Sequence, residues 1–181
     1  MREQFRLDRE YLHSRRLWIV KQYLGGKIAD LDLGTGRSPK GKISLDIDGR
    51  FKPNIVADVN HLPIRSESVN SVVCSHVIEH VNNVNRVLVE INRILKKDGL
   101  VFFFLPNDGS TLWRAIKSFW TIYYEKLVSK KSSPETHVHS FDGKNFRECI
   151  ERFFEPFSLG KMNMGMEIYA VCKRCKKQAN P

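Results

Sequence analysis

Short apolar segments of strand length recur between residues 28 and 105, and they constrain the fold more than any other feature. Each is apolar along most of its length, which is typical of strands that are buried on both faces. A helical spacing of apolar residues from Val84 to Leu95 ends at Gly99 and separates the last two segments. Strands that alternate with helices predict an α/β fold with a mostly parallel sheet covered on both faces. The predicted strands are 28–33, 42–47, 54–59, 69–75 and 100–105.

The rest of the chain is expected to add helices and two more strands to this core, within a single domain of residues 1–181. Gly25 and Gly26 end the apolar periodicity of the first helix. The segment after the fifth strand is rich in aromatic residues, which favours packing on the sheet, on a second copy in a homodimer, or on an acceptor. The predicted elements are a helix within 1–27, a helical lid or insertion at 108–142, a helix at 143–154, and strands at 156–161 and 166–172.

Positive charge is concentrated in peripheral segments of the chain. The net charge is +10, while residues 1–27, 111–131 and 173–177 each carry +4, so the remainder is slightly acidic. Such segments attract an anionic partner such as RNA, although basic surfaces also serve solubility alone.

The composition favours a reduced, cytoplasmic protein that does not associate with membranes. The longest apolar run has six residues, far fewer than a membrane-spanning helix needs, and the first ten residues lack the apolar region of a signal peptide. The four cysteines (Cys74, Cys149, Cys172 and Cys175) are too few to form a disulfide framework in a chain of this size.

A glycine loop, Gly34-Thr35-Gly36, follows the first predicted strand. Glycines there let the backbone turn sharply and approach a ligand. A dinucleotide-binding loop would have a third glycine at position 39 and a helix after it. This chain has Pro39, and only residues 37–42 precede the next strand. The pattern therefore disfavours NAD.

Aspartates stand at the ends of three successive predicted strands. Because parallel strands end at the same edge of a sheet, these carboxylates are expected to line one crevice. A ribose offers two adjacent hydroxyls to one carboxylate, and an adenine offers an amino group to another. The alternative is that each aspartate caps a helix or turn. The aspartates are Asp32, Asp46, Asp48 and Asp58.

The motifs LDLGTG, SLDID, VADVNHLPI, SVVCSHVIEHV and INRILKKDGLVFFFLPN resemble, in this order, those of class I S-adenosylmethionine (SAM)-dependent methyltransferases. The resemblance covers about residues 28–107. It is closest to type 11 members of short form, whose first helix is truncated. It implies a Rossmann-like, doubly wound sheet of seven strands, with the last strand antiparallel and SAM lying across the strand ends.

The resemblance also implies which residues bind the cofactor. Gly34, Thr35 and Gly36 would pass beneath the methionine part, and Asp32 would face its ammonium. Asp46 would accept the ribose hydroxyls, with Ile47 beside it, and Asp48 is the less favoured alternative for this contact. Near the adenine amino group the resemblance places Asp58, with the amide of Val59 beside the ring. It places Ser75 near the methyl group that is transferred.

The segment His76-Val77-Ile78-Glu79-His80 supplies the candidate catalytic residues. If it begins a helix, the spacing puts His76, Glu79 and His80 on one face. A histidine near neutrality can act as a general base towards a hydroxyl or an amine. The three residues also resemble the metal cluster of some O-methyltransferases, and the plain alternative is local hydrogen bonding. His137 and His139 are expected in a polar loop over the site.

The sequence therefore predicts a SAM-dependent methyltransferase whose acceptor is a small molecule. The Asn-Pro-Pro-Tyr type of motif that accompanies methylation of base amino groups is absent after the fourth predicted strand, which reads CSHV. Two alternatives stay open, namely an RNA methyltransferase that uses the basic segments and a non-catalytic SAM-binding protein.

Overall fold

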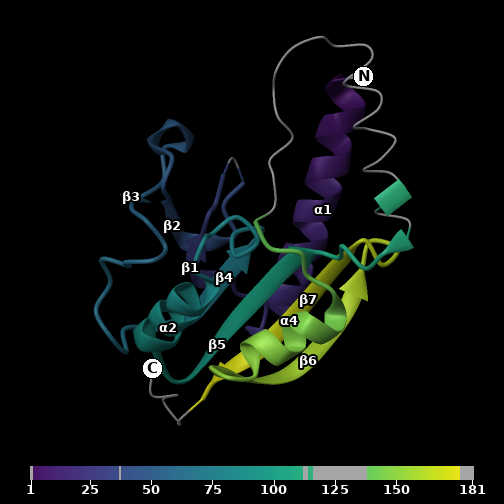
Figure 1. The fold of residues 1–181 in the computed structure, drawn as a ribbon. Helices are drawn as coiled ribbons and strands as arrows, with labels where there is room; N and C mark the ends of the chain where they lie inside the picture. Colours follow the sequence, from purple (N-terminus) through teal and green to yellow (C-terminus); the bar gives the residue numbers. More distant parts are fainter. Residues whose placement is uncertain (1, 37, 112–113, 116–137, 176–181) are drawn as a thin grey trace.

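The computed structural model describes residues 2–36, 38–111, 114–115 and 138–175. These residues form one seven-stranded sheet in the order β3-β2-β1-β4-β5-β7-β6 (Figure 1). β7 runs antiparallel to β5 and β6, and the other neighbouring pairs are parallel. This confirms the predicted Rossmann-like sheet with its last strand antiparallel. The strands are β1 (Ala29–Leu33), β2 (Gly41–Asp46), β3 (Ile55–Val56), β4 (Val69–Ser75), β5 (Leu95–Pro106), β6 (Phe154–Met162) and β7 (Glu167–Arg174).

The strand order reverses between β1 and β4. The chain proceeds outwards from β1 to β3 and then returns to place β4 beside β1, with Leu33 opposite Cys74. In open α/β sheets the crevice beyond the strand ends at such a reversal is where ligands bind. The predicted aspartates and the glycine loop therefore belong to this edge.

Helices cover both faces of the sheet. α2 (Val84–Ile94) and α4 (Gly143–Ile150) pack on the face that holds the larger core, which includes Leu31 and Phe103. α1 (Arg2–Tyr23) packs on the other face through Ile19 and Val20. Figure 1 shows α1 rising past the carboxyl ends of the strands, so this helix reaches the candidate site. None of the described helices is both long and apolar enough to cross a membrane.

Several boundaries differ from the prediction. The third strand is confined to Ile55–Val56, because β2 and β3 pair only at two positions. β5 begins at Leu95, through a bulge in which Asp98 has a φ of +63°. The helix predicted to begin at His76 begins at Val84 instead, and the Asn83 side chain caps it by accepting the Arg86 amide. The sequence prediction of a helix over His76–His80 was therefore wrong.

The other boundaries move by a few residues. α1 ends at Tyr23 within the predicted 1–27 segment, and α4 stops at Ile150 rather than at 154. Residues 112–113 and 116–137 lie outside the described residues, and so do most of the predicted lid at 108–142 and His137. The lid and the single-domain assignment stay predictions.

Candidate active site

The glycine loop turns away from β1 in a left-handed conformation, with φ of +63° at Gly34 and +51° at Gly36. The Gly34 amide donates to the Leu45 carbonyl at 2.8 Å, which joins the loop to β2. A Cβ atom on Gly34 would lie 2.3 Å from Cγ2 of Val77, whereas one on Gly36 would meet nothing within 4 Å. Gly34 is therefore required by packing, and Gly36 leaves open space for a ligand.

The loop leads directly into β2 without a helix among the described residues 34–36 and 38–41, as the truncated form predicts. Thr35 is buried, and its hydroxyl donates weakly to the Gly36 carbonyl at 3.5 Å. The backbone amide of Lys40 donates to Oδ2 of Asp32 at 2.5 Å. The segment thus folds back across the end of β1, in the place where a first helix would stand.

Asp32 is a fully buried carboxylate with one oxygen unused. Its Oδ1 atom has no hydrogen-bond partner among the described residues. Burial raises the pKa of Asp32 to about 6, although the nearby Lys40 lowers it. A carboxylate in this environment is stabilised by a cationic donor.

The two aspartates at the end of β2 have different surroundings. Asp46 is buried and accepts the amides of Gly36 at 2.8 Å and Asp48 at 2.9 Å, so it holds the glycine loop against β2. Asp48 caps the short helix η1 (Gly49–Phe51) and binds the Arg50 guanidinium, which lowers the pKa of Asp48. Ile47 is 71% exposed beside them. Asp46 therefore lies at the loop, while Asp48 is engaged with Arg50.

Asp58 is exposed just beyond β3. Its Oδ1 atom accepts the backbone amide of Asn60 at 2.8 Å and the side-chain amide at 2.9 Å, and the backbone bond lowers the pKa of Asp58 most. The adjoining Val59 is 9% exposed. Glu90 of α2 accepts the Leu62 amide at 2.9 Å and so ties the following segment to the core.

Ser75, the last residue of β4, is 4% exposed. Since Cys74 lies opposite Leu33, Ser75 ends β4 at the level where the glycine loop begins. Its hydroxyl has no hydrogen-bond partner among the described residues. The reversal point therefore holds unused buried polar atoms on both β1 and β4.

The structure brings His76, Glu79 and His80 together in a turn rather than on a helix. His76 adopts a φ of +56°. Its Nδ1 atom lies 3.2 Å from Oε1 of the fully buried Glu79, and Nε2 of His80 lies 4.0 Å from the same oxygen. Across the described part of the chain, no group of three or more His, Cys, Asp or Glu side chains is arranged to hold a metal ion.

A polar network that the sequence did not reveal surrounds His76. Nε2 of His76 lies 2.8 Å from Oε1 of Glu167 on β7 and 2.8 Å from Nη2 of Arg16 on α1. Arg16 also donates to Glu167 at 2.6 Å, and Asn163 donates to the other oxygen of Glu167 at 2.6 Å. Burial lowers the pKa of His76, but its contacts with Glu167 and Glu79 outweigh this and raise the pKa.

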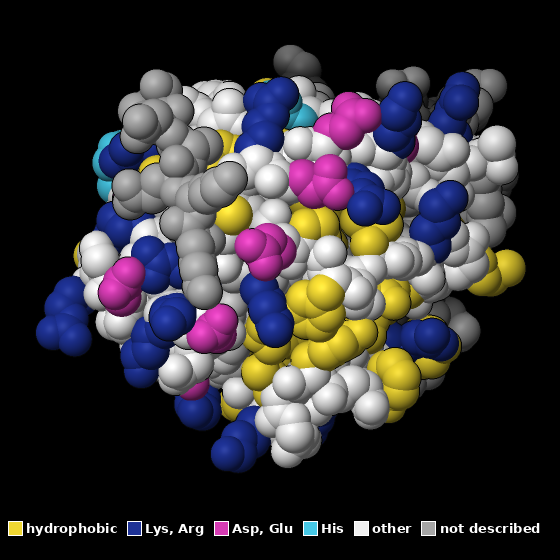
Figure 2. All heavy atoms as spheres, turned by 90° about the horizontal axis from the view of Figure 1, so that it is seen from below, with side chains coloured by type: hydrophobic (Ala, Val, Ile, Leu, Met, Phe, Trp, Pro, Cys, Tyr) yellow, Lys and Arg dark blue, Asp and Glu magenta, His cyan; other side chains and the backbone are white. Residues whose placement is uncertain are grey.

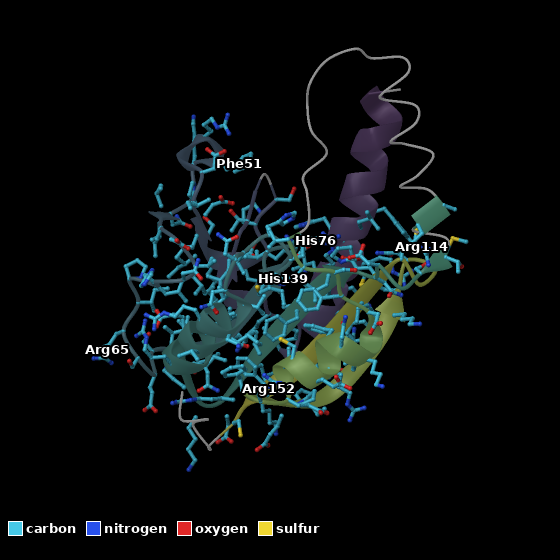
Figure 3. The ribbon with its side chains drawn as sticks, in the orientation of Figure 1. Phe51, Arg65, His76, Arg114, His139 and Arg152 are labelled. Carbon is cyan, nitrogen blue, oxygen red and sulfur yellow. The ribbon has the colours of Figure 1, made fainter. Side chains whose placement is uncertain are left out.

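The polar loop that contains His139 lies against this turn. The amides of Val138 and His139 donate to the Glu79 carbonyl at 2.8 and 3.1 Å. Figure 3 shows His76 and His139 near the carboxyl edge of the sheet, where α1 passes it. The described end of the loop, residues 138–140, therefore lies against the turn, and the position of the loop over the site stays a prediction.

Glu167 could have been found from the fold, because it is the one acidic residue at the start of the apolar run of β7. In an antiparallel last strand this first residue lies at the edge where the parallel strands end. Arg16 gave no comparable signal, since its partners lie far from it in the sequence.

The sequence matches a known domain family. The family model described as a methyltransferase domain matches residues 21–103. A malonyl-[acyl-carrier protein] O-methyltransferase of Geobacter sulfurreducens is 30% identical over 127 residues, which make up 69% of this chain and 45% of that protein. The chain spans between 40% and 57% of the length of the curated relatives that it matches.

Solved structures of methyltransferases share the fold. A SAM-dependent methyltransferase from Thermotoga maritima has a TM-score of 0.69 at 18% identity, with 96% of this chain and 97% of that chain covered. A 1,6-didemethyltoxoflavin-N1-methyltransferase from Burkholderia thailandensis, with bound S-adenosylhomocysteine (SAH), has a TM-score of 0.63 at 13% identity. The match covers 90% of this chain and 77% of that chain. Residues 21–103 thus match the methyltransferase-domain family, and the described residues adopt the fold of these SAM-dependent methyltransferases.

Proposed function

We propose that this protein transfers a methyl group from SAM to a small-molecule acceptor at the carboxyl edge of its sheet. The observation that carries the proposal is the buried Oδ1 atom of Asp32, which has no hydrogen-bond partner among the described residues. The ammonium group of SAM is a charged donor of the kind that such an oxygen requires. A tight turn alone would not need an unpaired buried carboxylate beside it.

The remaining groups at this edge fit the other parts of SAM. Asp46 is assigned to the ribose hydroxyls, because it is buried at the glycine loop while Asp48 is paired with Arg50. Ile47 is assigned to one face of the adenine, and Asp58 with Val59 to its polar edge. These assignments are supported by the position of each residue at the end of β2 or β3.

When bound, SAM supplies a methyl group on a positively charged sulfur. The protein then has to hold the acceptor in line and keep water away from it. Ser75 ends β4 beside the glycine loop and His76 follows it, and the contacts of Glu167 with both His76 and Arg16 support a rigid wall there. We assign the network a positioning role.

His80 remains the candidate base for acceptors that must lose a proton. The raised pKa of His76 favours its imidazolium form, which cannot accept another proton. His80 lies 4.0 Å from the shared Glu79 oxygen, and its side chain is 32% exposed. A turnover rate that falls strongly in His80→Gln but not in His76→Gln, with SAH affinity unchanged in both, would support this division.

RNA is the second candidate acceptor. On α1 the aromatic residues Tyr11 and Trp18 are 58% and 61% exposed, and Arg15 lies 5.8 Å from the Tyr11 ring. Exposed aromatic rings interleaved with basic residues suit stacking on unpaired bases. Figure 2 shows Lys and Arg side chains interspersed with Asp and Glu on the face seen from below. The small-molecule acceptor is favoured because the segment after β4 reads CSHV, without the Asn-Pro-Pro-Tyr type of motif that accompanies methylation of base amino groups.

The experiment begins with binding. Calorimetry should detect SAH binding to the parent and weaker binding of NADH, and an absence of SAH binding would refute the proposal. Methyl transfer from labelled SAM is then measured with pooled metabolites and with total RNA. Incorporation into RNA that falls steeply with salt would support the second candidate. Tight SAH binding with no incorporation into either pool would support the non-catalytic alternative.

A further inference from the structure

Lys40 is a buried lysine in the segment that replaces the first helix. The residue is 6% exposed, and its backbone amide donates to Asp32 at 2.5 Å. Removing an ammonium from water is costly unless charged or polar partners surround it. Its position therefore needs a reason beyond loop closure.

The described residues satisfy the Lys40 ammonium only in part. An ammonium has three N–H donors, and among the described residues the one hydrogen bond of Nζ is to the Ser38 carbonyl at 3.2 Å. Burial lowers the pKa of Lys40, and Asp32 and Glu167 offset this by attraction. Lys40 therefore lies within the electrostatic reach of both carboxylates without an exclusive ion pair.

Basic groups from two elements converge on this point. On α1, burial lowers the pKa of His13, and the positive charges of Lys40 and Arg16 lower it further. Glu167 is already engaged by Arg16 and His76. Asp32 is then the remaining counter-charge beside Lys40, and an anionic ligand group could accept the Nζ–H donors that no described residue uses.

We propose that Lys40 binds the carboxylate at the methionine end of SAM, next to the ammonium that faces Asp32. This inference rests on the proposed function. The methionine end of SAM carries both charges on one carbon, so its site needs an acidic and a basic side chain close together. The hydrogen bond from the Lys40 backbone amide to Asp32 keeps these two residues close together. A helix N-terminus often binds an anion, and here the lysine supplies that positive charge.

The test compares three ligands that differ at the methionine end, with SAM as the reference for decarboxylated SAM because both carry a positively charged sulfur. SAH carries both the ammonium and the carboxylate, decarboxylated SAM lacks the carboxylate, and methylthioadenosine lacks both groups. Lys40→Met should weaken SAH binding about ten- to a hundredfold, as expected for the loss of a charge-assisted bond. Binding of decarboxylated SAM and methylthioadenosine should change less than about threefold. The matched control is Lys42→Met, since Lys42 is 58% exposed and pairs with Asp30, and it should leave all three affinities unchanged.

Several results would overturn the inference. If Lys40→Met weakens the three ligands equally, Lys40 only supports the loop. If Lys40→Met does not fold, the parent protein decides. It should bind SAM at least about tenfold more tightly than decarboxylated SAM, because the two ligands differ only in the carboxylate. Equal affinities of the parent for these two ligands would refute a carboxylate site. A parent that binds none of these ligands would instead refute the proposed function.

Discussion

Gly34→Ala should destabilise the protein for two separable reasons. The φ of +63° at Gly34 places an alanine in the left-handed region, which costs about 1–2 kcal/mol. The added Cβ would also lie 2.3 Å from Cγ2 of Val77, well inside van der Waals contact. Val77 is buried and has a stiff, β-branched side chain, so relieving the overlap should cost about 1–3 kcal/mol more. The expected loss in the free energy of unfolding is about 2–5 kcal/mol.

Urea unfolding without ligand measures this loss, and two further variants separate its parts. Gly25→Ala is the matched control for backbone strain, because Gly25 has a φ of +58° and nothing within 4 Å of the added Cβ. It should lose only about 1–2 kcal/mol. The double variant Gly34→Ala/Val77→Ala should recover the steric part, giving a coupling energy of about 1–3 kcal/mol. Equal losses in Gly34→Ala and Gly25→Ala, or no coupling to Val77, would refute this reasoning.

Four other substitutions test the charges of the site. Asp46→Ala should weaken SAH binding about ten- to a hundredfold in calorimetry, whereas Asp48→Ala should change it less than about threefold. Asp32→Asn should raise the free energy of unfolding at pH 8 by about 1–3 kcal/mol and change it little at pH 4. The reason is that the raised pKa, from 3.8 to about 6, makes the parent lose stability as pH rises through that interval; no gain in urea unfolding at pH 8 would contradict this. Glu167→Gln should lower the free energy of unfolding by about 3 kcal/mol at low pH and should lower the His76 pKa in an NMR titration. The reason is that a raised His76 pKa stabilises the folded protein at low pH, and this stabilisation is lost as the pH rises through that pKa.

The strand ends were predictable from the sequence because local chemistry determines them. Leu31 and Leu33 are buried in one core, while Asp32 between them faces the opposite side, as the alternation of a strand requires. Parallel pairing then brings the ends of β1 and β2 to one edge, whatever lies between them. The glycine loop was predictable for the same reason, since its positive φ values favour glycine.

The turn at His76 and the network around it were not predictable in the same way. The spacing of His76, Glu79 and His80 also fits a helix, but Asn83 is the better start signal, because it caps α2 just before the apolar periodicity begins at Val84. The contact of Arg16 with Glu167 spans 151 residues, and no local pattern reports a pairing over that distance.

That separation has a consequence for how the protein is made. During synthesis Arg16 leaves the ribosome long before Glu167 does, so the edge of the sheet beside His76 stays incomplete until β7 has been added as the strand between β5 and β6. Until then Arg16 lacks its partner Glu167, and β5 is paired only with β4 on one side. Formation of the cofactor-binding edge is thus coupled to insertion of β7, and a nascent chain should acquire affinity for the cofactor only in the last stage of its folding.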